Sequence, residues 1–97
     1  METYFILCNY TQQGIENIKE SPQRIEVAKK ATEAAGGKWG GWWLTMGEYD
    51  FIVMAEAPNA QTVATLILAI GAQGNVRTKT MRAFTQDEFV AMAANMP

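Results

Sequence analysis

The stretch Met46-Gly47-Glu48-Tyr49-Asp50 lies between two strand-like runs, residues 39–45 and 51–57. Gly47 gives the backbone freedom that a tight reversal needs, because glycine adopts conformations closed to other residues. Tyr49 and Asp50 then place an aromatic ring and a carboxylate at the start of the second run. The stretch therefore predicts a β-hairpin, and it anchors the assignment of the elements on either side.

The flanking sequence predicts two further strands and two long helices. Ser21-Pro22 has the residue types that begin a helix, since serine accepts a hydrogen bond from a free amide and proline presets the first φ angle. Gly36-Gly37 ends that helix, Asn59 is a suitable N-cap for the next, and Thr85 with Glu88 predicts a capping box. In chain order we expect a strand at residues 4–10, a short helical turn at 15–20, a helix at 21–35, strands at 38–45 and 51–57, a helix at 60–71, a strand at 75–84 and a C-terminal helix at 86–94.

This order of elements is that of the ferredoxin-like βαββαβ fold, an α+β arrangement with a four-stranded antiparallel sheet and both long helices on one face. Right-handed crossovers place residues 4–10 and 51–57 in the centre of the sheet and the other two strands at its edges. The second sheet face is then uncovered, and monomers rarely expose large apolar patches. We therefore expect two copies to pack sheet against sheet as a homodimer, as in dimeric α+β barrels.

Length and composition fit a single domain over residues 1–97. A chain of this size buries only about 60 to 65% of its unfolded surface, so a lone monomer would be marginal. The net charge of −2 and the pI near 5.0 supply no broad positive field, which argues against nucleic acid as a partner. The start lacks the basic region of a signal peptide, and the longest apolar run, residues 63–72, is too short to span a bilayer. We expect a cytoplasmic protein with no membrane partner.

The residue types that carry much of enzyme chemistry are scarce. There is no histidine, and the single cysteine, Cys8, lies in an apolar strand where we expect a buried small hydrophobe and not a reactive thiol. A zinc or haem site would lack its commonest ligands, and the familiar catalytic triads would lack their base. No glycine-rich loop matches a phosphate-binding or dinucleotide fingerprint. The sequence therefore predicts no metal and no cofactor.

Short motifs at the turns and strand ends match, in the same order, those of one family of small proteins: Thr11-Gln12-Gln13-Gly14-Ile15, Gly47-Glu48-Tyr49-Asp50, Glu56-Ala57-Pro58, Gly74-Asn75-Val76-Arg77-Thr78 and Arg82-Ala83-Phe84-Thr85. On these motifs the sequence resembles the GYD-domain family, whose function is largely unassigned. That family is similar to dimeric α+β barrel proteins and to the effector-binding domains of leucine-responsive transcription regulators, where a glycine-containing hairpin lies near an amino-acid site. Because no helix-turn-helix pattern accompanies the fold in these 97 residues, the resemblance implies a ligand-binding or assembly module and not a DNA reader.

Three residues are candidates for a ligand site, and each also has a structural interpretation. Asp50 is a candidate general base or ligand acceptor; alternatively it caps turn amides or pairs with an arginine. Tyr49 either lines a pocket with its hydroxyl or packs in the core or an interface. Arg82, together with Arg77, is a candidate for holding an anion through two parallel hydrogen bonds. In the structural alternative, Arg77 and Lys79 protect an edge strand and Arg82 pairs with Asp50.

Two tryptophans and a polar loop complete the candidate set. Trp42 and Trp43 are neighbours on one strand, so their rings point to opposite sheet faces. We expect one ring to pack toward the helices and the other toward the partner subunit or a cavity, with packing favoured over substrate stacking. Thr11 and Gln13 follow the first strand, where they either donate hydrogen bonds to a small ligand or serve only the turn.

Two functions follow from this set of residues. The leading hypothesis is a homodimeric small-molecule-binding or assembly module, with a cavity on the non-helical sheet face near Asp50, Tyr49, Arg82 and one of the two tryptophans. The alternative is a cofactor-independent enzyme, similar to the monooxygenases and isomerases that share this barrel. Such an enzyme would act on a small hydrophobic or carbonyl compound with Asp50 as the base, an analogy that rests on the fold alone.

Overall fold

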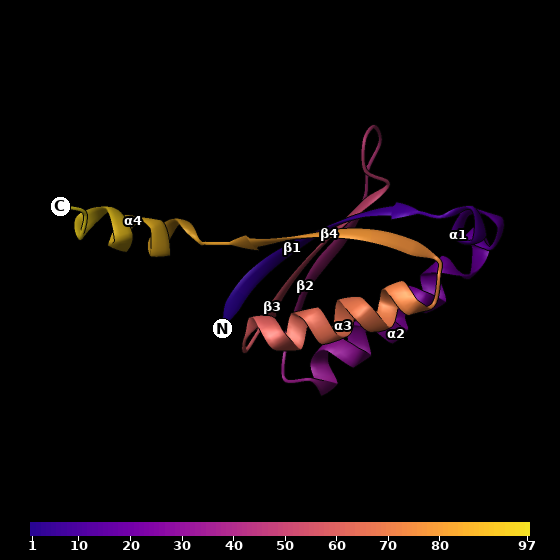
Figure 1. Ribbon diagram of the computed structural model, residues 1–97, viewed down its shortest axis with the longest axis horizontal. Coiled ribbons are helices and arrows are strands. Elements are labelled where there is room, and N and C mark those ends of the chain that lie inside the picture. Colours follow the sequence, from indigo (N-terminus) through magenta and orange to yellow (C-terminus); the bar gives the residue numbers. More distant parts are fainter.

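The computed structural model describes residues 1–97 and has the expected alternation of strands and helices (Figure 1). Its elements are, in chain order, β1 (Glu2–Tyr10), α1 (Gln12–Glu16), the 3-10 helix η1 (Ile18–Glu20), α2 (Ser21–Ala34), β2 (Lys38–Leu44), β3 (Phe51–Ala57), α3 (Ala60–Ala72), β4 (Val76–Ala83) and α4 (Gln86–Ala94). The strands and the long helices lie within two residues of the bounds that the sequence predicts. None of the helices has the length and apolar character that a bilayer crossing requires.

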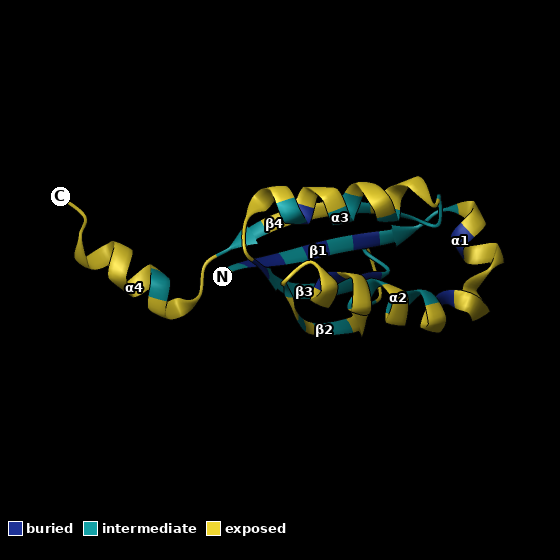
Figure 2. Cartoon of the chain, turned by 90° about the horizontal axis from the view of Figure 1, so that it is seen from below, coloured by how far each residue is buried: buried dark blue, intermediate teal, exposed yellow.

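The four strands form one antiparallel sheet in the order β2-β3-β1-β4. The central and edge strands are those that right-handed crossovers predict, so the ferredoxin-like prediction is confirmed. Helices α2 and α3 lie against one face of the sheet, and neither reaches the other face (Figure 1, Figure 2). The sheet therefore has one covered face and one open face.

The buried core lies between the sheet and the two long helices. Side chains alternate along a strand, so every second residue of β1 and β3 points to this side. The buried apolar residues of the two central strands are Tyr4, Ile6, Cys8, Phe51, Val53 and Ala57, and Val63 of α3 packs with them. Alternation thus assigns one half of each central strand to the core and leaves the other half to the open face.

Local signals set where the helices begin and end. The Asn59 side chain accepts a hydrogen bond from the Thr62 amide and starts α3, as predicted. Gly36 follows α2 with a φ of +85°, the left-handed conformation that ends a helix. The N-cap prediction for Ser21 is wrong, because η1 runs directly into α2 and Ser21 already lies in its first turn. The Ser21 hydroxyl instead lies 2.7 Å from the Tyr10 hydroxyl.

The C-terminal helix α4 projects away from the sheet and the other helices (Figure 1, Figure 2). The predicted capping box is present: the Thr85 hydroxyl accepts from the Glu88 amide, and the Glu88 carboxylate accepts from the Thr85 amide. This hydrogen bond from the backbone lowers the pKa of Glu88. Phe89, Val90 and Met92 are all exposed along the helix. The helix has a defined start, but it leaves its apolar residues in water.

Candidate functional site

The open face of the sheet is apolar at its centre. Phe5 and Leu7 of β1 point away from the helices, and the register places Phe5 opposite Met54 and Leu7 opposite Ile52 of β3. All four residues are only half-buried in the chain. The centre of this face is therefore made of side chains of the kind that fill protein cores.

The same cross-strand rows run to both edges of the sheet. Trp43 of β2 lies opposite Ile52 and is 51% exposed, and Met81 of β4 lies opposite Phe5 and is 49% exposed. Lys79 of β4 faces Leu7 and ends the second row with a charge. We call six residues the open-face cluster: Phe5, Leu7, Trp43, Ile52, Met54 and Met81. Apolar surface that crosses all four strands is typical of an interaction site.

The two neighbouring tryptophans point to opposite faces, as strand geometry requires. Trp42 faces the helices and stacks on Phe51, with the ring centres 5.0 Å apart and the planes at 24°. Trp43 lies on the open face, where its ring covers Gly41 so closely that a Cβ on Gly41 would come within 2.6 Å of it. The structure thus settles the faces that the sequence left unassigned.

Asp50 fastens the end of the hairpin to β1. Its Oδ2 atom accepts a hydrogen bond from the Tyr10 amide at 2.8 Å, and its own amide donates to the Cys8 carbonyl at 2.9 Å. The Asp50 carbonyl accepts from the Thr45 amide at 2.9 Å. The carboxylate therefore has a structural task at the strand end, and its part as a base or ligand acceptor stays a prediction.

Arg82 lies at the other end of the sheet from Asp50. The register places Arg82 opposite Tyr4, whereas Asp50 contacts Tyr10, six residues further along β1 and thus about 20 Å away. The predicted pairing of Arg82 with Asp50 is therefore wrong. The Arg82 guanidinium instead contacts groups at its own end of the sheet, namely the carbonyls of Thr3 and Ala83 and the rings of Tyr4 and Phe84.

Tyr49 borders the open face at the hairpin tip. Its ring centre is 5.7 Å from Nζ of Lys79, close enough for attraction between the ammonium and the ring. The hairpin tip, residues 46–49, rises from the sheet on the side away from α2 and α3 (Figure 1). Met46 at the tip is almost fully exposed. Of the predicted site residues, Tyr49 and Trp43 therefore lie on the open side of the sheet.

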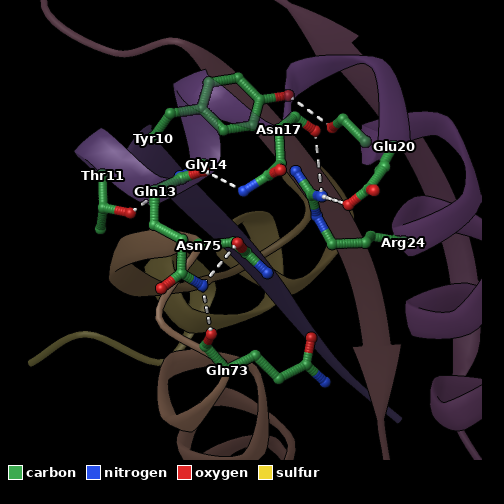
Figure 3. A network of polar contacts seen from close by, with 10 residues as sticks. Tyr10, Thr11, Gln13, Gly14, Asn17, Glu20, Arg24, Gln73 and Asn75 are labelled. Atoms are coloured by element: carbon green, nitrogen blue, oxygen red, sulfur yellow. Dashed lines mark hydrogen bonds and ion pairs between the residues drawn. The ribbon is translucent and has the colours of Figure 1, made fainter.

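Thr11 and Gln13 are occupied by contacts within the chain (Figure 3). The Thr11 hydroxyl accepts from the Gly14 amide at 3.1 Å, which caps α1, and donates to the Gly74 carbonyl at 2.6 Å. The Gln13 side-chain nitrogen donates to the Gln73 carbonyl at 2.9 Å and to the Asn75 side chain at 3.0 Å. These bonds tie α1 to the loop between α3 and β4. A ligand role for either side chain stays a prediction, and a ligand there would have to replace these hydrogen bonds.

An apolar cavity lies where the sequence did not indicate one. It has a volume of about 180 Å³ and lies between the sheet and helices α2 and α3, on the face opposite the open-face cluster. A cavity on the open face, as expected from the sequence, would need a second chain to close it. Ala28 and Ala31 of α2 line the cavity, and such small side chains on an inward helix face were the signal in the sequence.

The Cys8 thiol is buried, and the prediction of a small hydrophobe is confirmed. Cys8 is 3% exposed, and burial raises the pKa of its thiol to about 12. Because the thiolate is the reactive form, this thiol is a poor nucleophile at neutral pH.

A four-stranded antiparallel sheet with two helices on one face and a bare apolar face on the other defines a class of small ferredoxin-like α+β proteins. Within that class, the family model described as GYD domain matches residues 4–93. The chain belongs to the GYD-domain family. The family resemblance that the turn motifs indicate is thus confirmed over nearly the whole chain.

Other proteins are similar to this chain in sequence or in fold. A Thermus thermophilus protein described as a glutamine synthetase and cystathionine beta-lyase binding protein is 32% identical over 92 residues, which is 94% of this chain and 97% of that protein. Two solved structures share the fold. A feast or famine regulatory protein from M. tuberculosis, complexed with L-methionine, has a TM-score of 0.67 at 15% identity, over 89% of this chain and 52% of that one. A hypothetical protein from Pyrococcus horikoshii has a TM-score of 0.56 at 24% identity, over 89% of this chain and 93% of that one.

The regulator is the longer protein, and this chain spans about half of its length. At these identities the two structural likenesses establish the fold and nothing about ligands.

Proposed function

We propose that this chain is a non-catalytic assembly module that forms a homodimer through its open sheet face and binds a partner protein through surfaces that the dimer leaves free. The open-face cluster is the observation that carries the proposal. Its side chains are of core type, yet Trp43 and Met81 expose about half of their surface in the single chain. A second copy offers the same apolar surface, and a two-fold pairing buries both at once.

The size of the sheet indicates which other segments take part in the dimer. With strands about 4.8 Å apart and a rise of about 3.3 Å per residue, four strands of about seven residues present roughly 450 Å². A stable interface buries about 800 Å² on each partner, so the sheet face alone is too small. The hairpin tip and the exposed helix α4 are the neighbouring segments that can supply the remainder.

The arrangement of the candidate residues favours assembly over catalysis. Asp50 already accepts the Tyr10 amide, and Arg82 lies at the opposite end of the sheet, so the two do not converge on one substrate. The dimer would enclose the space between the two open faces, bordered by Trp43 and Tyr49. A small-molecule ligand of the kind expected from the sequence would lie there.

The nature of the partner is suggested by the relative from Thermus thermophilus. That protein is described as binding two enzymes, and it matches this chain over almost the full length of both. We therefore take an enzyme as the partner, with glutamine synthetase and cystathionine β-lyase as the first two candidates.

The test is direct binding of purified enzymes to the immobilised chain by biolayer interferometry. We expect at least one of the two enzymes, taken from the same cell as this protein, to bind with a Kd of about 10 µM or tighter, as a specific interface should give. Leu7→Glu, which disrupts the proposed dimer face, should weaken binding because a dimeric module engages an oligomeric enzyme at two points. Leu68→Glu, on the exposed side of α3, is the matched control. Failure of both enzymes to bind would contradict the proposed partner class.

A further inference from the structure

The cavity between the sheet and helices α2 and α3 plays no part in the proposed dimer, which forms on the opposite face. Of its 27 lining residues, 20 are hydrophobic, so its walls suit an apolar molecule. Three aromatic rings adjoin one another at one end: Tyr10 lies 5.1 Å from Phe51, and Phe51 lies 5.0 Å from Trp42, between ring centres. A cavity of about 150 Å³ accommodates benzene, so about 180 Å³ has room for one ring and a short substituent.

Two buried side-chain nitrogens lack a hydrogen-bond partner, and both belong to residues that line this cavity. They are Nε1 of Trp42 and Nη2 of Arg24. Both atoms can only donate, and a buried donor without an acceptor is destabilising. The chain itself offers no acceptor to either atom. A ligand that presents an acceptor would satisfy them.

Arg24 belongs to a polar corner where α2 meets the end of β1 (Figure 3). Its Nη1 donates to the Asn17 carbonyl at 3.3 Å and lies 3.7 Å from the exposed carboxylate of Glu20. The hydroxyls of Tyr10 and Ser21 pair at 2.7 Å in the same region. Tyr10 also begins the row of rings that ends at Trp42, so the row runs from the Arg24 corner to the ring that carries the second unpaired donor.

The charges along the cavity define its polarity. Arg24 and Glu56 are its only charged lining residues. Glu56 lies in β3 between Ala55 and Ala57, so its side chain points to the open face and its carboxylate does not face the cavity. Arg24 is therefore the charge on the cavity side, and it attracts an anion to its end of the cavity.

We propose that this cavity binds a small carboxylate with an apolar ring or branched chain. The apolar part fills the space, and the carboxylate accepts hydrogen bonds from Trp42 Nε1 and Arg24 Nη2. A carboxylate has two acceptor oxygens, one for each donor, and the positive charge of Arg24 favours it over a neutral acceptor. By comparison with benzene in about 150 Å³, the volume accommodates an apolar part of about seven non-hydrogen atoms, which is one ring and a methylene, with the carboxylate at the wall.

Phenylacetate is the probe, and phenethylamine, which carries the same ring with a cation, is its control. Both are titrated into ¹⁵N-labelled protein, and the indole N–H resonance of Trp42, assigned with Trp42→Phe, is followed by NMR. We expect phenylacetate to shift this resonance with a Kd of about 1 mM or tighter, as modest ligand efficiency allows for ten atoms. Phenethylamine should leave it in place.

Four variants locate the site. Arg24→Met and Trp42→Phe should each weaken phenylacetate binding by about tenfold, because each removes one donor to a charged acceptor. Since Trp42→Phe lacks the indole N–H, its affinity is measured from the backbone amide resonances of the same titration. Lys30→Met removes an exposed charge from the same helix and should leave the affinity unchanged. Ala28→Leu fills the cavity, so it should abolish binding while raising the melting temperature.

Several results would overturn the proposal. Equal binding of phenylacetate and phenethylamine would show that the site does not recognise a carboxylate. Undiminished binding of phenylacetate to Ala28→Leu would show that the ligand binds outside the cavity. The absence of any indole shift at about 10 mM phenylacetate would exclude the site, since the proposed affinity would nearly saturate it. If Arg24→Met fails to fold by circular dichroism, the other two cavity variants decide. The result is independent of dimerisation, because the cavity lies on the helix-covered face.

Discussion

Ile6 and Leu7 are neighbours in β1 and almost equal in hydrophobicity, yet they lie in different environments. Ile6 is 8% exposed beneath the helices, whereas Leu7 on the open face is only half-buried. The alternation of a strand fills both faces of this sheet with apolar residues, and the two crossover helices then cover just one of them. The same sequence pattern therefore specifies a core on one side of the sheet and an open apolar face on the other, and chain connectivity decides between them.

A charge at the centre of the open face should have the largest effect on the dimer. Leu7→Glu should weaken the dimer by at least about 150-fold, because an unpaired buried charge costs about 3 to 5 kcal/mol. Sedimentation velocity measures the change. Leu68→Glu makes the same substitution on a residue of α3 that is 73% exposed and should leave the dimer intact. A dimer that persists in Leu7→Glu would show that the open face is not the interface.

Alanine substitutions at Ile6 and Leu7 compare the covered face with the open face. Ile6→Ala should lower the free energy of unfolding by about 2 to 4 kcal/mol at every protein concentration, since it leaves a void within one chain. Leu7→Ala should have an effect that depends on concentration, because the contacts it removes form only between chains. Urea unfolding at two concentrations a hundredfold apart distinguishes the two. Identical concentration dependence in both variants would contradict the assignment of the faces.

The pH dependence of the free energy of unfolding tests whether Cys8 is buried on the covered face. The folded chain keeps the thiol proton to a pKa of about 12, whereas the unfolded chain loses it near 9.0. Above the lower value the unfolded state binds fewer protons, so the free energy of unfolding falls as pH rises, by about 1.4 kcal/mol at about pH 10. Below it this contribution is fully present. Cys8→Ala should lack the additional slope, and parallel curves for the two proteins would argue against a buried thiol.

The smallest expected effect concerns Trp43. Trp43 is 51% exposed in the single chain. Trp43→Ala should therefore lower the free energy of unfolding by only about 1 kcal/mol in dilute protein, well below the roughly 3 to 5 kcal/mol expected for a buried tryptophan. At concentrations where the dimer forms, the same variant should lose more, since the ring then lies between two sheets. Thermal unfolding over a dilution series measures both regimes, and a large cost at every concentration would place Trp43 in the core of the single chain.

The fold was accessible from the sequence because its signals are local. Gly47 at the hairpin takes a φ of +106°, and Asn59 and Thr85 accept the amide hydrogen bonds that start their helices. Each of these depends on a residue type and on neighbours within four positions. The strand order then follows from general rules of chirality, without further information from side chains.

The candidate site was less accessible because it depends on register and packing. Asp50 precedes β3 and Arg82 lies in β4, and both strands pair with β1, but only the register shows that the two residues lie at opposite ends of the sheet. The cavity is lined by residues of the sheet and of helices α2 and α3 that lie far apart in the sequence, such as Tyr10, Ala28 and Trp42, so no single motif encodes it. No sequence pattern marks Arg24 as a site residue, because its unpaired nitrogen results from how α2 packs against the end of β1.

Sedimentation equilibrium of the unmodified protein measures whether the open face pairs with a second copy. With a chain mass of 10.7 kDa, we predict a single species of twice that mass. The dimer should hold at concentrations of a few micromolar, where an interface of standard size is populated. A species of one chain mass that persists up to about 100 µM would contradict the account, because the open face would then remain in contact with water.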